Sequence, residues 1–141
     1  MTTTTNSVAP KSLKIIAILA ILWNLMGVMS YIGQSLITSG QMEGDDLMIM
    51  DYPTWVTAAY ATAVFSGFIG SITLLMRKKI SNLLFILSLV CVIAKSIYDY
   101  TIVDNEYFYT TGALVFSALI YLIAIYLIMY SKKGMDKGWL N

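Results

Sequence analysis

The stretch Met76-Arg77-Lys78-Lys79-Ile80 places three consecutive cations between two long apolar segments of this chain. Each segment has the length of a membrane-spanning helix, which needs about 20 apolar residues to cross roughly 30 Å of hydrocarbon. A connection this short joins two such helices as an antiparallel hairpin. Because cytoplasmic loops of membrane proteins carry an excess of Lys and Arg, we expect this turn to lie in the cytoplasm.

The composition favours a membrane environment for the chain as a whole. Of its 141 residues, 58% are hydrophobic and 12% are charged, and the mean hydropathy is +0.74. Soluble domains carry roughly 25% charged residues. A soluble domain of this size could not hide so much apolar surface, because small domains keep a large exposed area. The length allows at most one ordinary domain.

Two further apolar runs bring the expected spans to four, at residues 13–32, 54–76, 80–100 and 110–130. The first run could alternatively be a signal peptide, because two lysines lie at its start. Its apolar core is too long for that, and no A-x-A-like cleavage site follows it. The sequence therefore predicts an all-α fold, an integral membrane four-helix bundle over residues 11–130. A disordered cytoplasmic tail (1–10) precedes this bundle, and a basic cytoplasmic tail (131–141) follows it.

The charged residues are segregated along the chain, which predicts the orientation of the bundle. Eight of the nine cations lie near the ends or in the central turn: Lys11, Lys14, Arg77, Lys78, Lys79, Lys132, Lys133 and Lys137. Seven of the eight acids lie elsewhere: Glu43, Asp45, Asp46, Asp51, Asp99, Asp104 and Glu106. Four spans with both termini in the cytoplasm place every cationic cluster inside, whereas an odd number would place one basic terminus outside.

The aromatic residues favour the same arrangement, because Trp and Tyr are enriched at both membrane–water boundaries. Two mark the expected inner boundary, Tyr130 and Trp139. A larger group gathers at the expected outer boundary: Tyr31, Tyr52, Trp55, Tyr98, Tyr100, Tyr107 and Tyr109.

Several classes of chemistry have no support in this sequence. It contains one cysteine, Cys91, and no histidine, which excludes an intramolecular disulfide, Cys/His metal sites and His-based catalysis. We interpret Cys91 as a packing residue, since no base lies near it in sequence. No phosphate-binding glycine loop is present, and no basic patch interleaved with aromatics suggests nucleic-acid binding. We therefore expect no enzyme, no cofactor and no nucleic-acid partner.

The second expected span carries a stripe of small residues. Its members recur at spacings of three or four, so that they share one helix face: Ala63, Ser66, Gly67, Gly70 and Ser71. Such a face lets a neighbouring backbone approach closely and replaces the absent hydrophobic drive with van der Waals contact. It could form a dimer seam or a thin wall of a substrate path. The favoured interpretation is helix packing within one bundle.

Polar residues within the spans are the candidate functional residues. Lys95 and Asp99 stand at i and i+4 in the third span, where they can pair, and intramembrane ionisable residues often mark functional sites. Lys95 could instead snorkel to the interface. Asn24, in the middle of the first span, could simply clasp a neighbouring helix. The sharper hypothesis is an outward-facing polar cavity that binds substrate and is lined by Asn24, Lys95, Tyr98 and Asp99.

The runs at residues 13–27 (LKIIAILAILWNLMG) and 53–59 (PTWVTAA) carry a resemblance to a family. Most of the chain resembles small four-span proteins of the bacterial inner membrane that end in a basic segment, as residues 133–140 do here. Some of these carry a generic sugar-transporter label. Small multidrug exporters also have four spans, but they place an essential glutamate in the first span, where this chain has Asn24.

The resemblance and the polar residues lead to two functional expectations. The first is a component of a small-solute transporter in the bacterial inner membrane, in contact with the lipid bilayer. Such a component is expected to form a homo-oligomer or join a larger membrane complex, because four short spans rarely enclose a path alone. The alternative is a non-catalytic accessory or scaffold subunit of a larger membrane complex.

Overall fold

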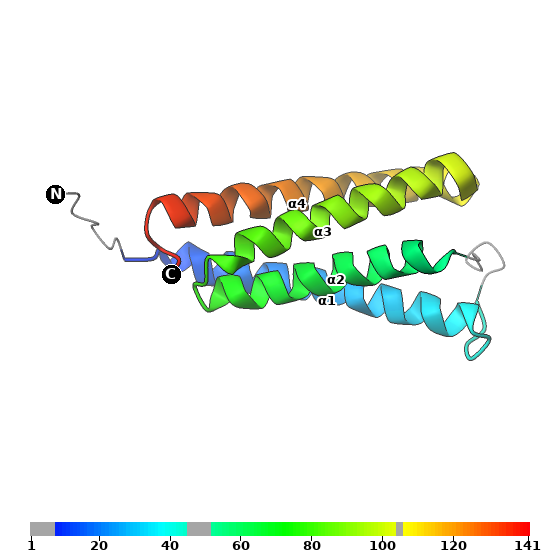
Figure 1. The fold of residues 1–141 in the computed structure, drawn as a ribbon, viewed down its shortest axis with the longest axis horizontal. Helices are drawn as coiled ribbons and strands as arrows, with labels where there is room; N and C mark the ends of the chain where they lie inside the picture. Colours follow the sequence, from blue (N-terminus) through cyan, green and yellow to red (C-terminus); the bar gives the residue numbers. More distant parts are fainter. Residues whose placement is uncertain (1–7, 45–51, 104–105) are drawn as a thin grey trace.

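The computed structural model describes residues 8–44, 52–103 and 106–141, and these residues form helices and connecting turns without a strand. Four of the helices are long and apolar enough to cross a membrane. They are α1 (Lys11–Thr38), α2 (Thr54–Leu75), α3 (Ile80–Tyr98) and α4 (Thr111–Asp136), shown in Figure 1. The predicted all-α bundle of four apolar helices is confirmed. Most of the tail expected to be disordered, residues 1–7, lies outside the described residues.

The outer helices are longer than the apolar runs alone predicted. Helix α1 continues to Thr38 rather than ending near residue 32, and α4 continues to Asp136 rather than residue 130. Residues 131–136 therefore belong to α4, and the prediction of a tail beginning at 131 is wrong for them. The extension is stabilised because the Asn82 amide of α3 donates to Ser131 Oγ at 2.9 Å, and Gly134 is covered by Leu140 of the segment that follows α4.

The cationic connection forms the tight hairpin that its length predicted. Helix α2 ends at Leu75 and α3 begins at Ile80. Arg77 adopts a left-handed conformation with φ of 60°, which lets the chain reverse within four residues. The Lys78 amide donates to the Thr73 carbonyl at 2.8 Å, so the end of α2 is satisfied.

The chain after α4 folds back onto this hairpin. Gly138, with φ of 73°, turns the chain at the end of α4. Leu140 is then 1% exposed. The Asn141 amide donates to the Arg77 carbonyl at 2.6 Å, and the Lys79 amide donates to the Asn141 main-chain oxygen at 2.8 Å. The returning segment thus ties the end of α4 to the turn between α2 and α3.

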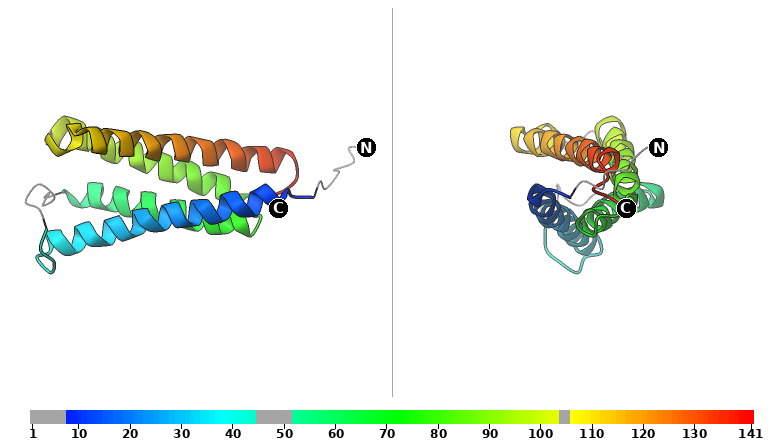
Figure 2. Two further views of the ribbon diagram at one scale, coloured as in Figure 1. Left: turned by 180° about the vertical axis from the view of Figure 1, so that it is seen from behind. Right: turned by 90° about the vertical axis from the view of Figure 1, so that its left-hand side faces the viewer.

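Most of the buried apolar residues gather at this end of the bundle. They form one cluster: Leu13, Ala17, Ala20, Leu74, Phe85, Leu127 and Leu140. Both described chain ends and the central hairpin lie here, as Figures 1 and 2 show. We call this end, with residues 11, 76–80 and 136–141, the closed end. The opposite end, with residues 38, 54, 103 and 111, is the open end.

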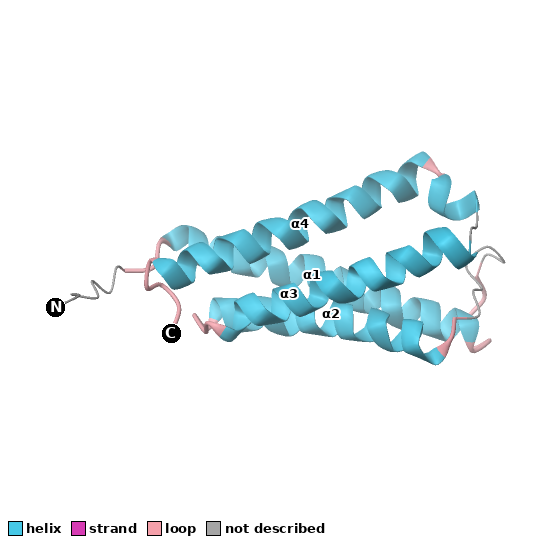
Figure 3. Ribbon diagram, turned by 45° about the horizontal axis from the view of Figure 1, so that its top comes forward, coloured by secondary structure: helices cyan, strands magenta, loops and turns pink. Residues whose placement is uncertain are grey.

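The helices pack unequally, and this difference creates an interior space. Helix α2 packs against both α1 and α3, whereas α4 packs mainly against α3. The rings of Trp23 on α1 and Phe116 on α4 meet with centroids 5.7 Å apart. Towards the open end α4 diverges from α1 and α2, as Figures 2 and 3 show.

Candidate functional site

A cavity of about 760 Å³ lies between the four helices. Along α1 its lining runs from Trp23 to Ile37, which at 1.5 Å per residue corresponds to roughly 21 Å. Its inner limit is formed by Phe85 and Leu127, which belong to the buried cluster of the closed end. Its other limit is near Tyr107 at the open end. The cavity is therefore a long groove that stops at the closed end.

The strongest polar feature of the lining is an ion pair on α3. Lys95 Nζ lies 2.6 Å from Asp99 Oδ2, and the two side chains are 16% and 8% exposed. The predicted i, i+4 pair is confirmed. Asp99 begins a π-helical turn, Asp99–Val103, that continues α3. The Tyr52 hydroxyl donates to Asp99 Oδ1 at 2.8 Å, so both carboxylate oxygens are engaged.

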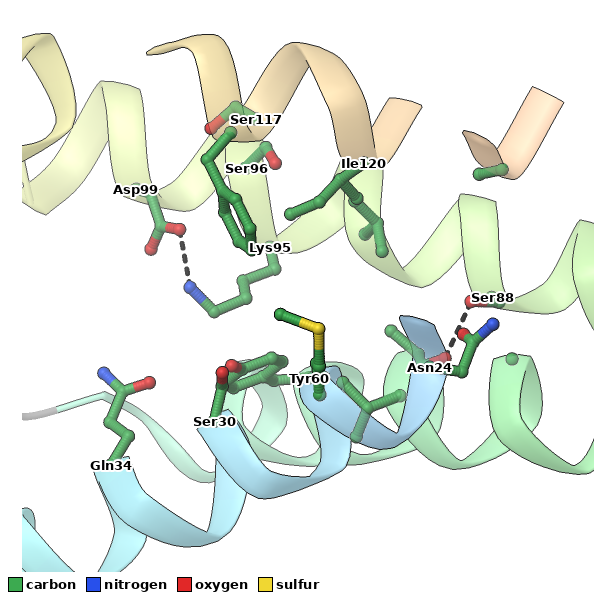
Figure 4. A pocket seen from close by; sticks show the side chains of 18 of the residues that line it. Asn24, Ser30, Gln34, Tyr60, Ser88, Lys95, Ser96, Asp99, Ser117 and Ile120 are labelled. Carbon is green, nitrogen blue, oxygen red and sulfur yellow. Dashed lines mark hydrogen bonds and ion pairs between the residues drawn. The ribbon is translucent and has the colours of Figure 1, made fainter. Parts of the chain in front are cut away.

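Aromatic rings enclose the ammonium group of Lys95. Its Nζ lies 4.8 Å from the ring centroid of Tyr52 and 5.0 Å from that of Tyr60, both within the range of cation–π attraction. Figure 4 shows the Lys95 side chain reaching from α3 towards α1 and α2. Lys95 therefore points into the bundle, where Asp99 neutralises its charge.

Tyr52 keeps its proton at this position. Burial, the negative charge of Asp99 and the hydrogen bond to that carboxylate all raise the pKa of the Tyr52 hydroxyl far above its usual range. The hydroxyl therefore remains a donor to Asp99 throughout the physiological range. In this way the residue just before α2 fixes the orientation of the ion pair on α3.

Asn24 serves as a clasp and also lines the cavity. Its side-chain amide donates to the Ala20 carbonyl at 2.8 Å and to Ser71 Oγ at 3.1 Å, which connects α1 with α2. The interpretation of Asn24 as a helix–helix clasp is confirmed. Asn24 and Lys95 line the same cavity, as the polar-cavity hypothesis required.

Tyr98 is a correction to the predicted site. It does not belong to the lining of the cavity. It precedes Asp99 by one residue, about 100° around a helix, and so points to another face. Its ring packs against Trp55 and Tyr52, with centroids 5.5 and 6.1 Å apart. Tyr98 therefore supports Tyr52 from behind.

The sequence analysis missed several residues that line the cavity, and only some of them could have been identified from the sequence. Ser88 and Val92 lie one turn apart on the same face of α3 as Lys95 and Asp99, so helical spacing could have identified them. The contributions of the other helices depend on how the helices are rotated against α3. They include Ser30, Gln34, Tyr60, Phe116 and Ser117.

The small-residue face of α2 packs inside the bundle. Ala63, Ser66, Gly67, Gly70 and Ser71 are all buried, so the favoured interpretation, packing within one bundle, is confirmed. A Cβ atom at Gly67 would collide with Asn24 Oδ1 and lie 3.1 Å from Ser88 Oγ. The absence of a side chain at Gly67 therefore allows the Asn24 clasp to form.

We expect Gly67→Ala to lower the free energy of unfolding by about 1–3 kcal/mol, the usual cost of overpacking. The added methyl group must displace the Asn24 carboxamide, which is held by its bonds to Ala20 and Ser71. Thermal unfolding of the purified protein measures the change. Asn24→Ala removes the colliding atom, so adding Gly67→Ala to it should cost much less than in the wild type. Additive losses would contradict this explanation.

No family model, curated protein or solved structure matches this chain. The cavity and its ion pair are therefore the basis for assigning a function.

Proposed function

We propose that this protein is a component of a small-solute transporter of the bacterial inner membrane, and that its substrate occupies the cavity. The observation that carries the proposal is the Lys95–Asp99 pair, which lines a cavity of about 760 Å³ between helices apolar enough to cross a membrane. Ionisable groups are costly within a bilayer and tend to mark substrate or ion pathways. The volume lies within the range of small-molecule sites, roughly 300–1,000 Å³.

The one-sided shape of the cavity supports transport. The buried cluster and the returning segment, residues 137–141, block the closed end, whereas the helices diverge towards the open end. A transporter that alternates its access needs a state in which the site reaches one side of the membrane only. This conformation corresponds to such a state.

The charge distribution supports an orientation with both termini in the cytoplasm. The three cationic clusters lie at the closed end, on the first turn of α1, in the central hairpin and at the end of α4. The described acids of the open end include Asp99 and Glu106. By the positive-inside rule the closed end faces the cytoplasm, so the cavity opens to the outside.

Cysteine labelling tests this orientation. In a Cys91→Ser background, Glu43→Cys and Lys132→Cys each introduce one exposed thiol, at the open and the closed end respectively. We expect a membrane-impermeant maleimide to modify Glu43→Cys in intact spheroplasts and Lys132→Cys only after lysis. The reverse pattern would overturn the orientation, and labelling of both in intact cells would overturn the even number of spans.

A ligand screen tests the transporter assignment. The purified protein in lipid nanodiscs is melted with sugars, amino acids, small cations and short-chain alcohols. A ligand at about 100 times its dissociation constant should stabilise the native state by about 2.7 kcal/mol. The shift should be lost in Lys95→Met and Asn24→Leu and kept in Lys132→Met, which removes an exposed lysine outside the cavity.

The same preparation tests the alternative function. If no compound stabilises the protein and a stoichiometric foreign protein copurifies with it, the chain is an accessory or scaffold subunit. A clean homo-oligomer that responds to a ligand supports the transporter component.

A further inference from the structure

The charges of the cavity lining cancel one another. Within the described residues, Lys95 and Asp99 are the charged side chains of the lining, and they pair at 2.6 Å. A ligand with a net charge would have to separate them and leave one buried charge uncompensated, which is strongly unfavourable. The lining therefore favours a ligand without net charge.

Spare hydrogen-bonding capacity is found at the level of this ion pair. Ser30 on α1, Ser96 on α3 and Ser117 on α4 all line the cavity, and Figure 4 shows them around Lys95. Their hydroxyls make no hydrogen bond within the part of the chain that the structure describes. A hydroxyl both donates and accepts, so the three serines can bind a neutral polar group that presents hydroxyls or carbonyls.

The inner half of the cavity offers apolar surface. Its polar side chains are already engaged, since Asn24 donates to Ala20 and Ser71, and Ser88 donates to the Ala63 carbonyl at 2.7 Å. The remaining side chains include Phe85, Ile120, Ile123 and Leu127. From Ser117 to Leu127 this part extends roughly 15 Å along α4. It matches a slender apolar tail.

Helices α1 and α4 pack weakly against each other. Side chains of these helices meet at the Trp23–Phe116 ring pair and, nearer the closed end, where the Ser12 and Tyr130 hydroxyls lie 3.3 Å apart. Beyond the ring pair the two helices separate towards the open end (Figure 3). Both helices line the cavity, and they are not among the closely packed helix pairs of the bundle. Their boundary is therefore the side on which a molecule dissolved in the membrane would enter.

We propose that the cavity binds an uncharged amphiphile taken from the surrounding bilayer. Its hydroxyl- or carbonyl-bearing head lies beside Lys95, Asp99 and the three serines, and its apolar tail lies along the inner half. The proposal rests on the proposed function, in which the cavity holds the substrate, and it names the class of that substrate.

Fluorescence quenching in nanodiscs tests the proposal, because Trp23 lines the cavity. Trp55→Phe/Trp139→Phe leaves Trp23 as the single reporter. Trp23→Phe/Trp139→Phe leaves Trp55, which is 55% exposed and serves as the lipid-facing control. The probes are three amphiphiles with the same brominated chain and a glyceryl, a phosphate or a trimethylammonium head. We expect the glyceryl probe to quench Trp23 at a mole fraction roughly tenfold lower than the charged probes, a preference of about 1.4 kcal/mol. All three should quench Trp55 equally.

Two variants link the preference to the cavity. Ser117→Ala removes one spare hydroxyl without adding bulk and should reduce the preference for the glyceryl head. Ala124→Phe fills the inner half, where Ala124 is a lining residue, and should abolish quenching of Trp23 by all three probes at low mole fraction. If Trp23 is quenched equally by the three heads, or more strongly by a charged one, the proposal is overturned.

The ligand screen separates this failure from a failure of the proposed function. If a sugar, amino acid or cation stabilises the protein and the glyceryl probe quenches Trp23 no better than the charged probes, the cavity is a substrate site. In that case the proposal that its substrate is an uncharged amphiphile is wrong. If neither a solute nor the probe acts, both proposals fail.

Discussion

Asp99→Ala is expected to lower the free energy of unfolding by about 3–5 kcal/mol, the cost of removing one partner of a buried ion pair. The Asp99 side chain is 8% exposed and accepts from both Lys95 and Tyr52. Without it the Lys95 ammonium group stays in the cavity without a counter-charge, and its remaining contacts are the Tyr52 and Tyr60 rings and a long hydrogen bond to the Tyr52 hydroxyl, 3.5 Å. Unfolding of the protein in nanodiscs or mild detergent, followed by circular dichroism, measures the loss.

The double variant Lys95→Met/Asp99→Leu separates the cost of an unpaired charge from the value of the pair. Replacing both partners by apolar residues of similar size is often neutral or stabilising, so we expect it to be far more stable than Asp99→Ala. Lys132→Met, which removes an exposed cation elsewhere, should change stability by less than about 0.5 kcal/mol. If the double variant loses as much free energy of unfolding as its two single variants together, an unpaired buried charge is not the cause of the instability of Asp99→Ala. The same variant should lose ligand-dependent stabilisation, because it lacks the polar centre of the cavity.

Leu140→Ala is the second change for which we expect a large effect, a loss of about 2–5 kcal/mol. Leu140 is 1% exposed, and its Cγ lies 3.2 Å from the position of a Cβ atom at Gly134. The truncation leaves a void between α4 and the buried cluster of the closed end. It also weakens the bonds of Asn141 to Arg77 and Lys79. We therefore expect the Lys79 amide to exchange its hydrogen faster, in addition to the lower melting temperature.

Leu122→Ala is the matched control for this prediction. It is the same substitution on α4, at a position that is 64% exposed in the bundle, so it should change stability by less than about 0.5 kcal/mol. If Leu122→Ala and Leu140→Ala are equally destabilised, the returning segment makes no special contribution to the closed end.

The number of helices and the central hairpin could be predicted from the sequence. Membrane thickness sets a minimum length for each apolar run, and the three cations at 77–79 mark a turn between two such runs. The pairing of Lys95 with Asp99 also followed, since residues four apart on a helix are neighbours whatever the helix packs against. The packing of the small-residue face of α2 could also be predicted from the sequence, because small side chains let helices approach closely where no hydrophobic drive holds them together.

The lengths of α1 and α4 were harder to predict from the sequence. Their ends lie beyond the apolar runs, in segments with polar and charged residues such as Gln34 and Lys132. Hydropathy shows where a chain can cross hydrocarbon, but a helix continues as long as its backbone bonds and packing favour it. The contacts of Ser131 with Asn82 and of Gly134 with Leu140 therefore favour the continuation of α4 beyond its apolar run.

The cavity itself was decided by tertiary structure. Tyr52 reaches Asp99 and Asn24 reaches Ser71 across 47 residues of sequence, and Ser117 joins the lining through the rotation of α4. The local sequence could not specify which helix faces meet. Lipid tails are as apolar as a protein core, so a face that contacts lipid needs no different side chains from a face that packs inside the bundle. The outward and inward faces of each helix therefore look alike in hydropathy. The sequence by itself determined four apolar helices, their connections and the helical neighbours within each. Only packing determined which faces meet around the ion pair.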